Sequence, residues 1–132
     1  MSEKNVAVIR LLAGKVQGEQ ANRDAAVLAR YYSDNGADEI LVFDLSDTDA
    51  DHDLSIGALK EICRAVEVPV KAGGRIKRLE DVKKILYAGC EKVILNYGRQ
   101  ENIDLTEEAS KRFGKEKIRS PYLVSRADFV AC

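Results

Sequence analysis

The stretch of sequence that decides the fold is residues 68–76, which read VPVKAGGRI. A short β-branched run is followed by two glycines, Gly73 and Gly74, and then by a segment with the apolar spacing of a helix. Glycines let the backbone turn sharply and bare its N–H groups, and the start of a helix carries partial positive charge. A strand, a glycine turn and a helix in this order predict a site for a phosphate group.

Strand and helix patterns alternate four times along the rest of the chain. Buried strands are predicted at residues 6–12, 39–45, 69–72 and 92–96, and the polar residues 14–22 are predicted to form a loop. Helices are predicted at 24–35, 54–66 and 79–88, and a fourth from a capping-box-like start at Asp104 and Glu107 to Gly114. This alternation is typical of an α/β fold with parallel strands and helical crossovers.

The length and composition indicate one domain over residues 1–132 with an irregular tail after about residue 115. Residues 117–124 could form a fifth strand, but Pro121 would interrupt its hydrogen bonds. Hydrophobic residues make up 45% of the chain, charged residues 33%, and the net charge is -1. Without a basic excess, a signal segment or a long apolar run, we expect a soluble cytoplasmic protein that binds neither nucleic acid nor membrane.

Few residues in the sequence are suited to bind a metal ion or to act as a catalytic nucleophile. Cys63, Cys90 and Cys132 are far apart in the sequence and lack a zinc-site spacing, so we interpret them as free thiols. His52, the one histidine, has no partner at the spacing of a catalytic triad. It also stands where a calcium loop over residues 47–53 would need glycine, so this acidic run is predicted to be a solvated loop that caps the next helix. We expect no metal and no cofactor.

The order and spacing of these units resemble the N-terminal half of the (βα)8 barrels of histidine biosynthesis. The residues that carry the resemblance are FDLS after the second strand, AGGRI after the third and LN after the fourth. It covers roughly residues 6–114 and is closer to the cyclase subunit of imidazole glycerol phosphate synthase than to the ProFAR isomerase. The fold it implies is a (βα)4 half of a TIM barrel.

The resemblance implies a phosphate site at Gly73, Gly74 and Asn96, because the family binds a substrate phosphate at these positions. Arg75 replaces a third glycine, and it either adds a guanidinium to the phosphate or crowds the turn. The alternative is that the glycines only permit a tight turn. The ligand expected from the family is a phosphorylated, ribonucleotide-like small molecule.

The catalytic acids of the family are missing from the matching positions. Arg10 stands where the first acid is expected, and an arginine cannot take up a proton near neutral pH. The second acid position falls near Leu123, with Asp128 out of register. Asp44, at the end of the second strand, is either a functional acid or an acceptor for the adjacent loop. The cyclase-type lyase activity is therefore not expected from this chain as it stands.

The resemblance also implies gate-like charges at the other end of the barrel. Lys4, Glu39 and Lys92 match the charges through which ammonia reaches the cyclase from a glutaminase partner; alternatively they are ordinary polar residues at strand starts.

A half-barrel would leave bare strand edges and an uncovered apolar face. We expect completion by a homo-oligomer or a second half-barrel, or a rearrangement toward a flavodoxin-like sandwich. Three functions fit these observations. The residues favour a half-barrel that binds a phosphate ligand and has lost its catalytic acids. The alternatives are a cyclase half that is active after assembly and a structural oligomerisation module.

Overall fold

The computed structural model describes residues 4–21, 23–95 and 100–119 of the chain. Within them one six-stranded sheet has the order β2-β1-β3-β4-β5-β6. The strands are β1 (Val6–Leu12), β2 (Lys15–Val16), β3 (Glu39–Asp44), β4 (Val70–Gly73), β5 (Lys92–Ile94) and β6 (Ile118–Arg119). All neighbours are parallel except β2, which pairs antiparallel with the end of β1.

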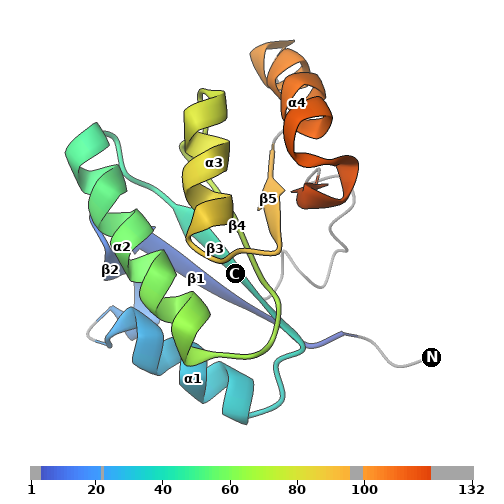
Figure 1. Cartoon of the computed structure of the whole chain (residues 1–132). Coiled ribbons are helices and arrows are strands. Elements are labelled where there is room, and N and C mark those ends of the chain that lie inside the picture. The colour runs from blue at the N-terminus through green and yellow to red at the C-terminus, as the bar shows by residue number, and fades with distance from the viewer. Residues whose placement is uncertain (1–3, 22, 96–99, 120–132) are drawn as a thin grey trace.

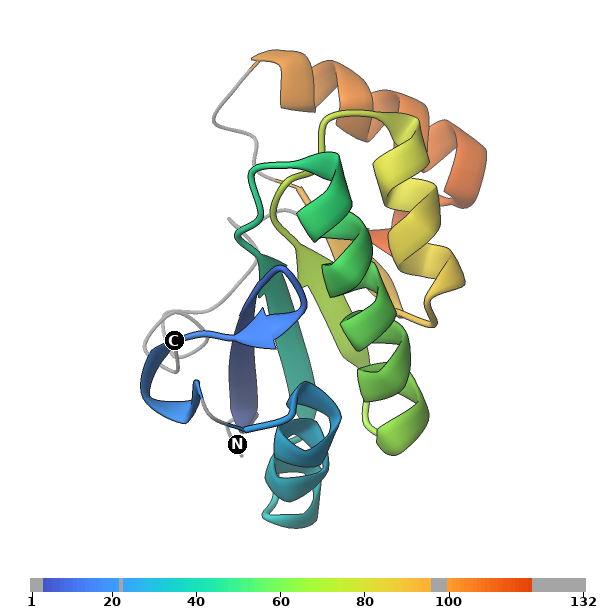
Figure 2. The same ribbon diagram turned by 90° about the vertical axis from the view of Figure 1, so that its left-hand side faces the viewer.

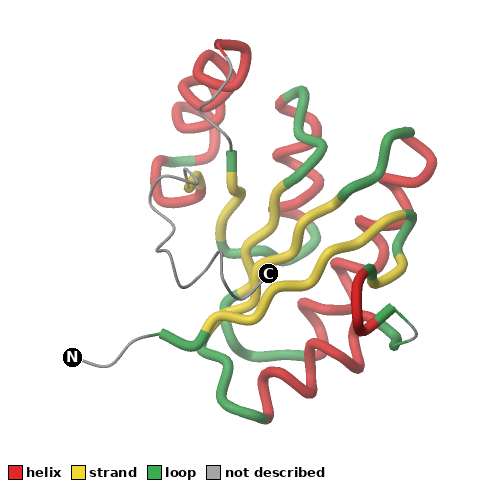
Figure 3. The backbone as a smooth tube through the Cα atoms, turned by 180° about the vertical axis from the view of Figure 1, so that it is seen from behind, coloured by secondary structure: helices red, strands yellow, loops and turns green. Residues whose placement is uncertain are grey.

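The described α-helices lie on one face of this sheet (Figures 1 and 3). They are α1 (Ala25–Asp34), α2 (Asp49–Ala65), α3 (Leu79–Tyr87) and α4 (Gln100–Phe113), and short 3-10 turns lie at Gly18–Gln20 and Lys115–Lys117. Parallel strands in chain order with helices on one face are the arrangement of a partial (βα) barrel. The predicted α/β fold with parallel strands of a partial (βα) barrel is confirmed, and the flavodoxin-like alternative, which needs a different strand order and helices on both faces, is not adopted.

The core lies between the sheet and the helices. Alternate strand residues point to this side and pack on helix residues such as Leu28 and Ile62. The buried strand residues of this core are Ile9, Leu11, Val16, Ile40, Val42, Val70, Ala72 and Val93. None of the described α-helices covers the opposite face (Figure 2). Leu12 and Leu45 are 38% and 48% exposed.

Capping residues set where α1 and α2 begin. The Asp24 carboxylate accepts from the backbone N–H of Val27 at 3.1 Å, as the sequence predicts. Thr48 Oγ1 accepts from the backbone N–H of Asp51 at 3.1 Å, so α2 begins at Asp49 and not near residue 54. The predicted loop over residues 47–53 is therefore wrong for 49–53, which form the start of α2, while residues 47 and 48 precede the helix. A threonine cap followed by aspartates in the first turn suits the positive end of the helix dipole.

Other boundaries also differ from the prediction. Residues 14–22 are not all loop: Ala13 and Gly14, with φ of 52° and 78°, make a two-residue turn into β2. The fourth helix begins at Gln100, so Asp104 and Glu107 lie inside it and do not cap it. The fifth strand is found at Ile118–Arg119, and residues 120–124 of its predicted range, with Pro121, lie outside the described residues.

No helix among the described residues combines the length and apolar character needed to cross a lipid bilayer.

Candidate functional site

The turn after β4 is fixed by close backbone packing. Gly74 has φ +84°, and a Cβ on it would lie 2.3 Å from the backbone oxygen of Asp44. Gly73 does not have a positive φ; its constraint is steric, because a Cβ there would lie 2.8 Å from the carbonyl oxygen of Ile94. Both positions therefore need glycine, and only Gly74 needs it for backbone conformation.

Arg75 continues the turn with φ +37°, and its side chain reaches the start of α2. One guanidinium nitrogen lies 2.9 Å from Asp49 Oδ1 and another donates to the backbone oxygen of Asp47 at 3.5 Å. The Arg75 side chain is 10% exposed, whereas that of Asp49 is 76% exposed. The hydrogen bond and the charge of Arg75 hold the pKa of the Asp49 carboxyl below its ordinary value.

Arg75→Gln should return the Asp49 pKa toward its ordinary value, because the variant removes both the guanidinium hydrogen bond and its charge. The Asp49 carboxyl would then protonate at higher pH than in the parent chain. An NMR pH titration of the Asp49 side chain measures this shift. Lys84→Gln is the control, since Lys84 makes only the smallest contribution to the shift; an equal effect of the two variants would contradict the assignment.

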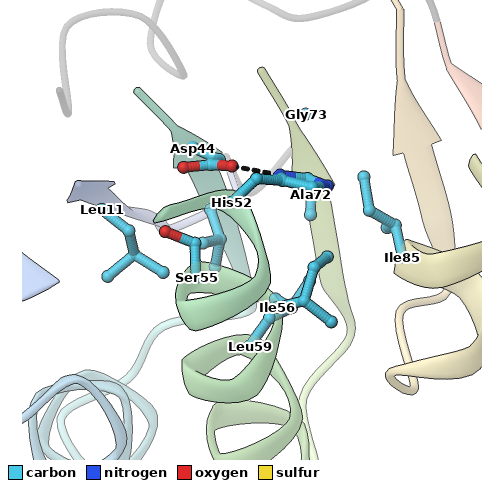
Figure 4. A pocket seen from close by; sticks show the side chains of 10 residues that line it. Leu11, Asp44, His52, Ser55, Ile56, Leu59, Ala72, Gly73 and Ile85 are labelled. Carbon is cyan, nitrogen blue, oxygen red and sulfur yellow. Dashed lines mark hydrogen bonds and ion pairs between the residues drawn. The ribbon is translucent and has the colours of Figure 1, made fainter. Parts of the chain in front are cut away.

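Asp44 points toward α2, and both of its carboxylate oxygens have partners. Oδ1 accepts from the backbone N–H of Ser46 at 3.0 Å, and Oδ2 lies 2.5 Å from Nδ1 of His52 (Figure 4). The loop-acceptor role that the sequence left open for Asp44 is thus present.

His52 is 1% exposed and lies between two aspartates. Its Nε2 is 3.8 Å from Oδ1 of Asp81, and neither atom has a hydrogen-bond partner among the described residues. The other oxygen of Asp81 accepts from the backbone N–H groups of Lys77 and Arg78, at 2.9 and 3.1 Å. His52 therefore lies between the end of β3, to which it is hydrogen-bonded, and the start of α3. The spacing of residues in the sequence did not predict the pairing of His52 with the Asp44 carboxylate.

A small cavity lies beside His52 and has room for about one water molecule. Its wall is mostly apolar, with Asp44, His52 and Ser55 as the polar members (Figure 4). Ser55 Oγ accepts from the backbone N–H of Gly14 at 3.0 Å and lies 3.3 Å from Ser46 Oγ. These bonds join the β1–β2 turn to α2 and hold the carboxyl-end rim of the sheet together.

Arg10 and Asp44 lie on opposite faces of the sheet. The register pairs Arg10 with Phe43, and Phe43 with Gly73, so these three share the open face. Asp44 pairs instead with Leu11, which packs in the core on the helix side. The exposed Arg10 side chain therefore cannot approach the Asp44 carboxylate directly.

The predicted gate charges are partly brought together. Glu39 is buried, and its Oε2 lies 3.7 Å from Nζ of Lys4. The same oxygen pairs with Nζ of Lys71, a buried lysine that the sequence reasoning missed. Lys92 is the register neighbour of Lys71 on β5. Lys71 could have been singled out from the sequence, because it is a charged residue within an otherwise apolar strand. Asn96, Leu123 and Asp128 lie outside the described residues.

The fold and its rim define the class of protein: a partial parallel (βα) barrel with polar side chains and a glycine turn at the carboxyl ends of its strands. Residues 4–120 match the family model described as "Histidine biosynthesis protein", and the chain belongs to that family.

Similar curated proteins are described as imidazole glycerol phosphate synthase subunit HisF. The protein of Helicobacter hepaticus is 38% identical over 101 residues, which cover 76% of this chain and 40% of the relative. That of Methanocaldococcus jannaschii is 38% identical over 95 residues, 72% of this chain and 35% of the relative. That of Staphylococcus epidermidis RP62A is 36% identical over 91 residues, which cover 69% of this chain and 36% of the relative. The matched part of this chain thus spans about two fifths of these relatives or less.

Proposed function

We propose that this chain is a half-barrel that binds a phosphorylated small molecule and lacks the full pair of catalytic acids. The observation that carries the proposal is the turn at Gly73–Arg75 in a chain of the histidine biosynthesis family. Asp81 already accepts the N–H groups of Lys77 and Arg78, so the donors proposed for a phosphate are the N–H groups of residues 74–76.

The side chains around the turn support an anion site. Asn96 follows β5 in sequence and is the proposed second ligand. Arg75 is the proposed third ligand, and to contribute its charge it would exchange Asp49 for the phosphate. Arg10 at the position of the first acid, together with the engaged carboxylate of Asp44, favours binding without turnover.

A thermal-shift titration tests this proposal, with inorganic phosphate, adenosine 5′-monophosphate and adenosine as probes. Binding to the native state alone raises Tm with ligand concentration, by several degrees at about a hundred times Kd. We expect saturable shifts with the nucleotide and with phosphate, and none with adenosine. Equal shifts with the nucleotide and adenosine, or no shift with any probe, would contradict a phosphate site and favour an assembly module.

A pair of variants locates the binding. Arg75→Gln should weaken nucleotide binding by about tenfold, the scale of one charge-assisted hydrogen bond. Lys60→Gln removes the same charge from an exposed position on α2 and should leave binding unchanged. Equal losses would mean that the nucleotide follows net charge and not the turn. Tighter binding by Arg75→Gln would mean that the arginine crowds the turn.

We also propose that a second half-barrel, of this chain or another, covers the open face. The supporting observation is the exposure of Leu12 and Leu45 on that face, beside the half-buried Phe43. Light scattering of the purified chain is expected to give a homo-oligomer. A glutaminase-like partner at the end of the sheet that holds Glu39 is proposed from the family resemblance alone.

A further inference from the structure

Two cysteine side chains from distant parts of the sequence meet at the end of α2. Cys63 lies near the end of that helix, and Cys90 lies in the short connection between α3 and β5. Their Sγ atoms are 3.9 Å apart although the residues are 27 positions apart. Cys90 is buried and Cys63 is half-buried. The fold thus places two free thiols in contact, with one of them reachable from solvent.

The backbones around the two thiols are also close. A Cβ built on Gly89 would lie 3.0 Å from Cβ of Cys63, so the chain leading to Cys90 passes directly over that side chain. An S–S bond is about 2.05 Å long, so the sulfurs would need to approach by roughly 1.9 Å. A rotamer adjustment at the half-buried Cys63 is the smallest movement that brings them together.

The two thiols differ in acidity. A hydrogen bond from the Cys90 thiol lowers the pKa of Cys63, whereas Cys63 and burial raise the pKa of Cys90. The thiolate is the reactive form of cysteine. Cys63 is therefore the nucleophile that meets an oxidant, and Cys90 remains a protonated thiol beside it. Such an arrangement has the two parts of a redox site, an attacking cysteine and a resolving cysteine.

We propose that Cys63 and Cys90 form a reversible oxidation site, which closes to a disulfide in the folded chain when a peroxide is present. The Cys63 thiolate attacks one peroxide oxygen and breaks the O–O bond; the sulfur becomes a sulfenic acid and the other oxygen leaves as water after taking up a proton. The Cys90 sulfur then attacks the sulfenic sulfur, loses its proton and expels a second water. Two thiols are oxidised to one disulfide, and one hydrogen peroxide is reduced to two waters.

The bond would join α2 to the segment before β5 and close a long loop of the unfolded chain. Cross-links of this kind stabilise the native state mainly by restricting the unfolded one. A dithiol reductant reverses the step by thiol exchange. The proposal is independent of phosphate binding, because both cysteines lie at the opposite end of α2 from Thr48 and Asp49.

The test uses the full chain with Cys132→Ser, so that only these two thiols remain. After hydrogen peroxide treatment under native conditions, peptide mapping without reduction should find Cys63 and Cys90 in one cross-linked peptide, with the mass of two hydrogens lost. Tm should rise by several degrees and return after dithiothreitol. Cys63→Ser and Cys90→Ser, each in the same background, should give no cross-link.

Three outcomes would overturn the proposal. One is oxidation of Cys63 to sulfinic acid, or its coupling to another chain, without an internal cross-link. Another is a cross-link that forms only in urea, and the third is a fall in Tm on cross-linking. A separate measurement tests the assigned roles: in Cys90→Ala, alkylation of Cys63 by iodoacetamide should shift to higher pH, because the hydrogen bond that lowers its pKa is gone.

Discussion

Replacing Gly74 by alanine should lower the free energy of unfolding by more than about 3 kcal/mol. A left-handed backbone costs an ordinary L-residue about 1–2 kcal/mol, and φ at Gly74 is +84°. The larger part of the loss is steric. The new Cβ would lie 2.3 Å from the backbone oxygen of Asp44 and 2.8 Å from its nitrogen, so the turn and the end of β3 would have to separate. Urea unfolding followed by circular dichroism measures the loss.

Two other glycines are matched controls. Gly36 has φ +99° with nothing within 4 Å of its Cβ position, so Gly36→Ala should lose only the backbone cost, about 1–2 kcal/mol. Gly57 lies in α2 with open space around it, and Gly57→Ala should gain about 0.5–1 kcal/mol from helix propensity. If Gly74→Ala lost no more than Gly36→Ala, the turn after β4 would not be held against β3 as described.

The parallel strands were predictable because the sequence carries their pattern locally. The largely apolar runs at 6–12 and 39–45 favour buried strands, and Asp24 marks the start of a helix because its side chain can cap it. The start of α2 was missed because aspartates suit a loop and a first helical turn equally well, and Thr48 decides between them. The two-residue strand β2 is too short to show any periodicity.

The candidate site was less predictable, because its contacts join residues far apart in the sequence. The sequence identified Gly73 and Gly74 as a turn. Only the packing against β3 and β5 shows that Gly74 is required for its positive φ, whereas Gly73 is required because a side chain would collide with Ile94. His52 meets Asp81 because α2 and α3 lie side by side, and no spacing rule in one sequence relates the two. The pairing of Lys71 with Glu39 depends likewise on strand register.

His52→Ala should lower the free energy of unfolding by about 2–4 kcal/mol. The side chain is 1% exposed, so truncation enlarges the cavity beside it. It also removes the hydrogen bond to Oδ2 of Asp44, a carboxylate that is only 10% exposed and would be left without that partner. Lys60→Ala, at an exposed position of the same helix, should change stability by less than about 0.5 kcal/mol. Chemical denaturation of the variants gives both values.

A double-mutant cycle separates the hydrogen bond from the cavity. Asp44→Ala and His52→Ala together should cost at least about 1 kcal/mol less than the sum of the single losses, because either change alone already breaks the bond between them. The same cycle with Asp81→Ala should show a smaller coupling, since Nε2 of His52 and Oδ1 of Asp81 are 3.8 Å apart and outside hydrogen-bond distance. Additive losses for Asp44 and His52 would mean that burial alone holds the histidine. Equal couplings in both cycles would place His52 midway between two equivalent carboxylates, with the start of α3 bound to it as firmly as the end of β3.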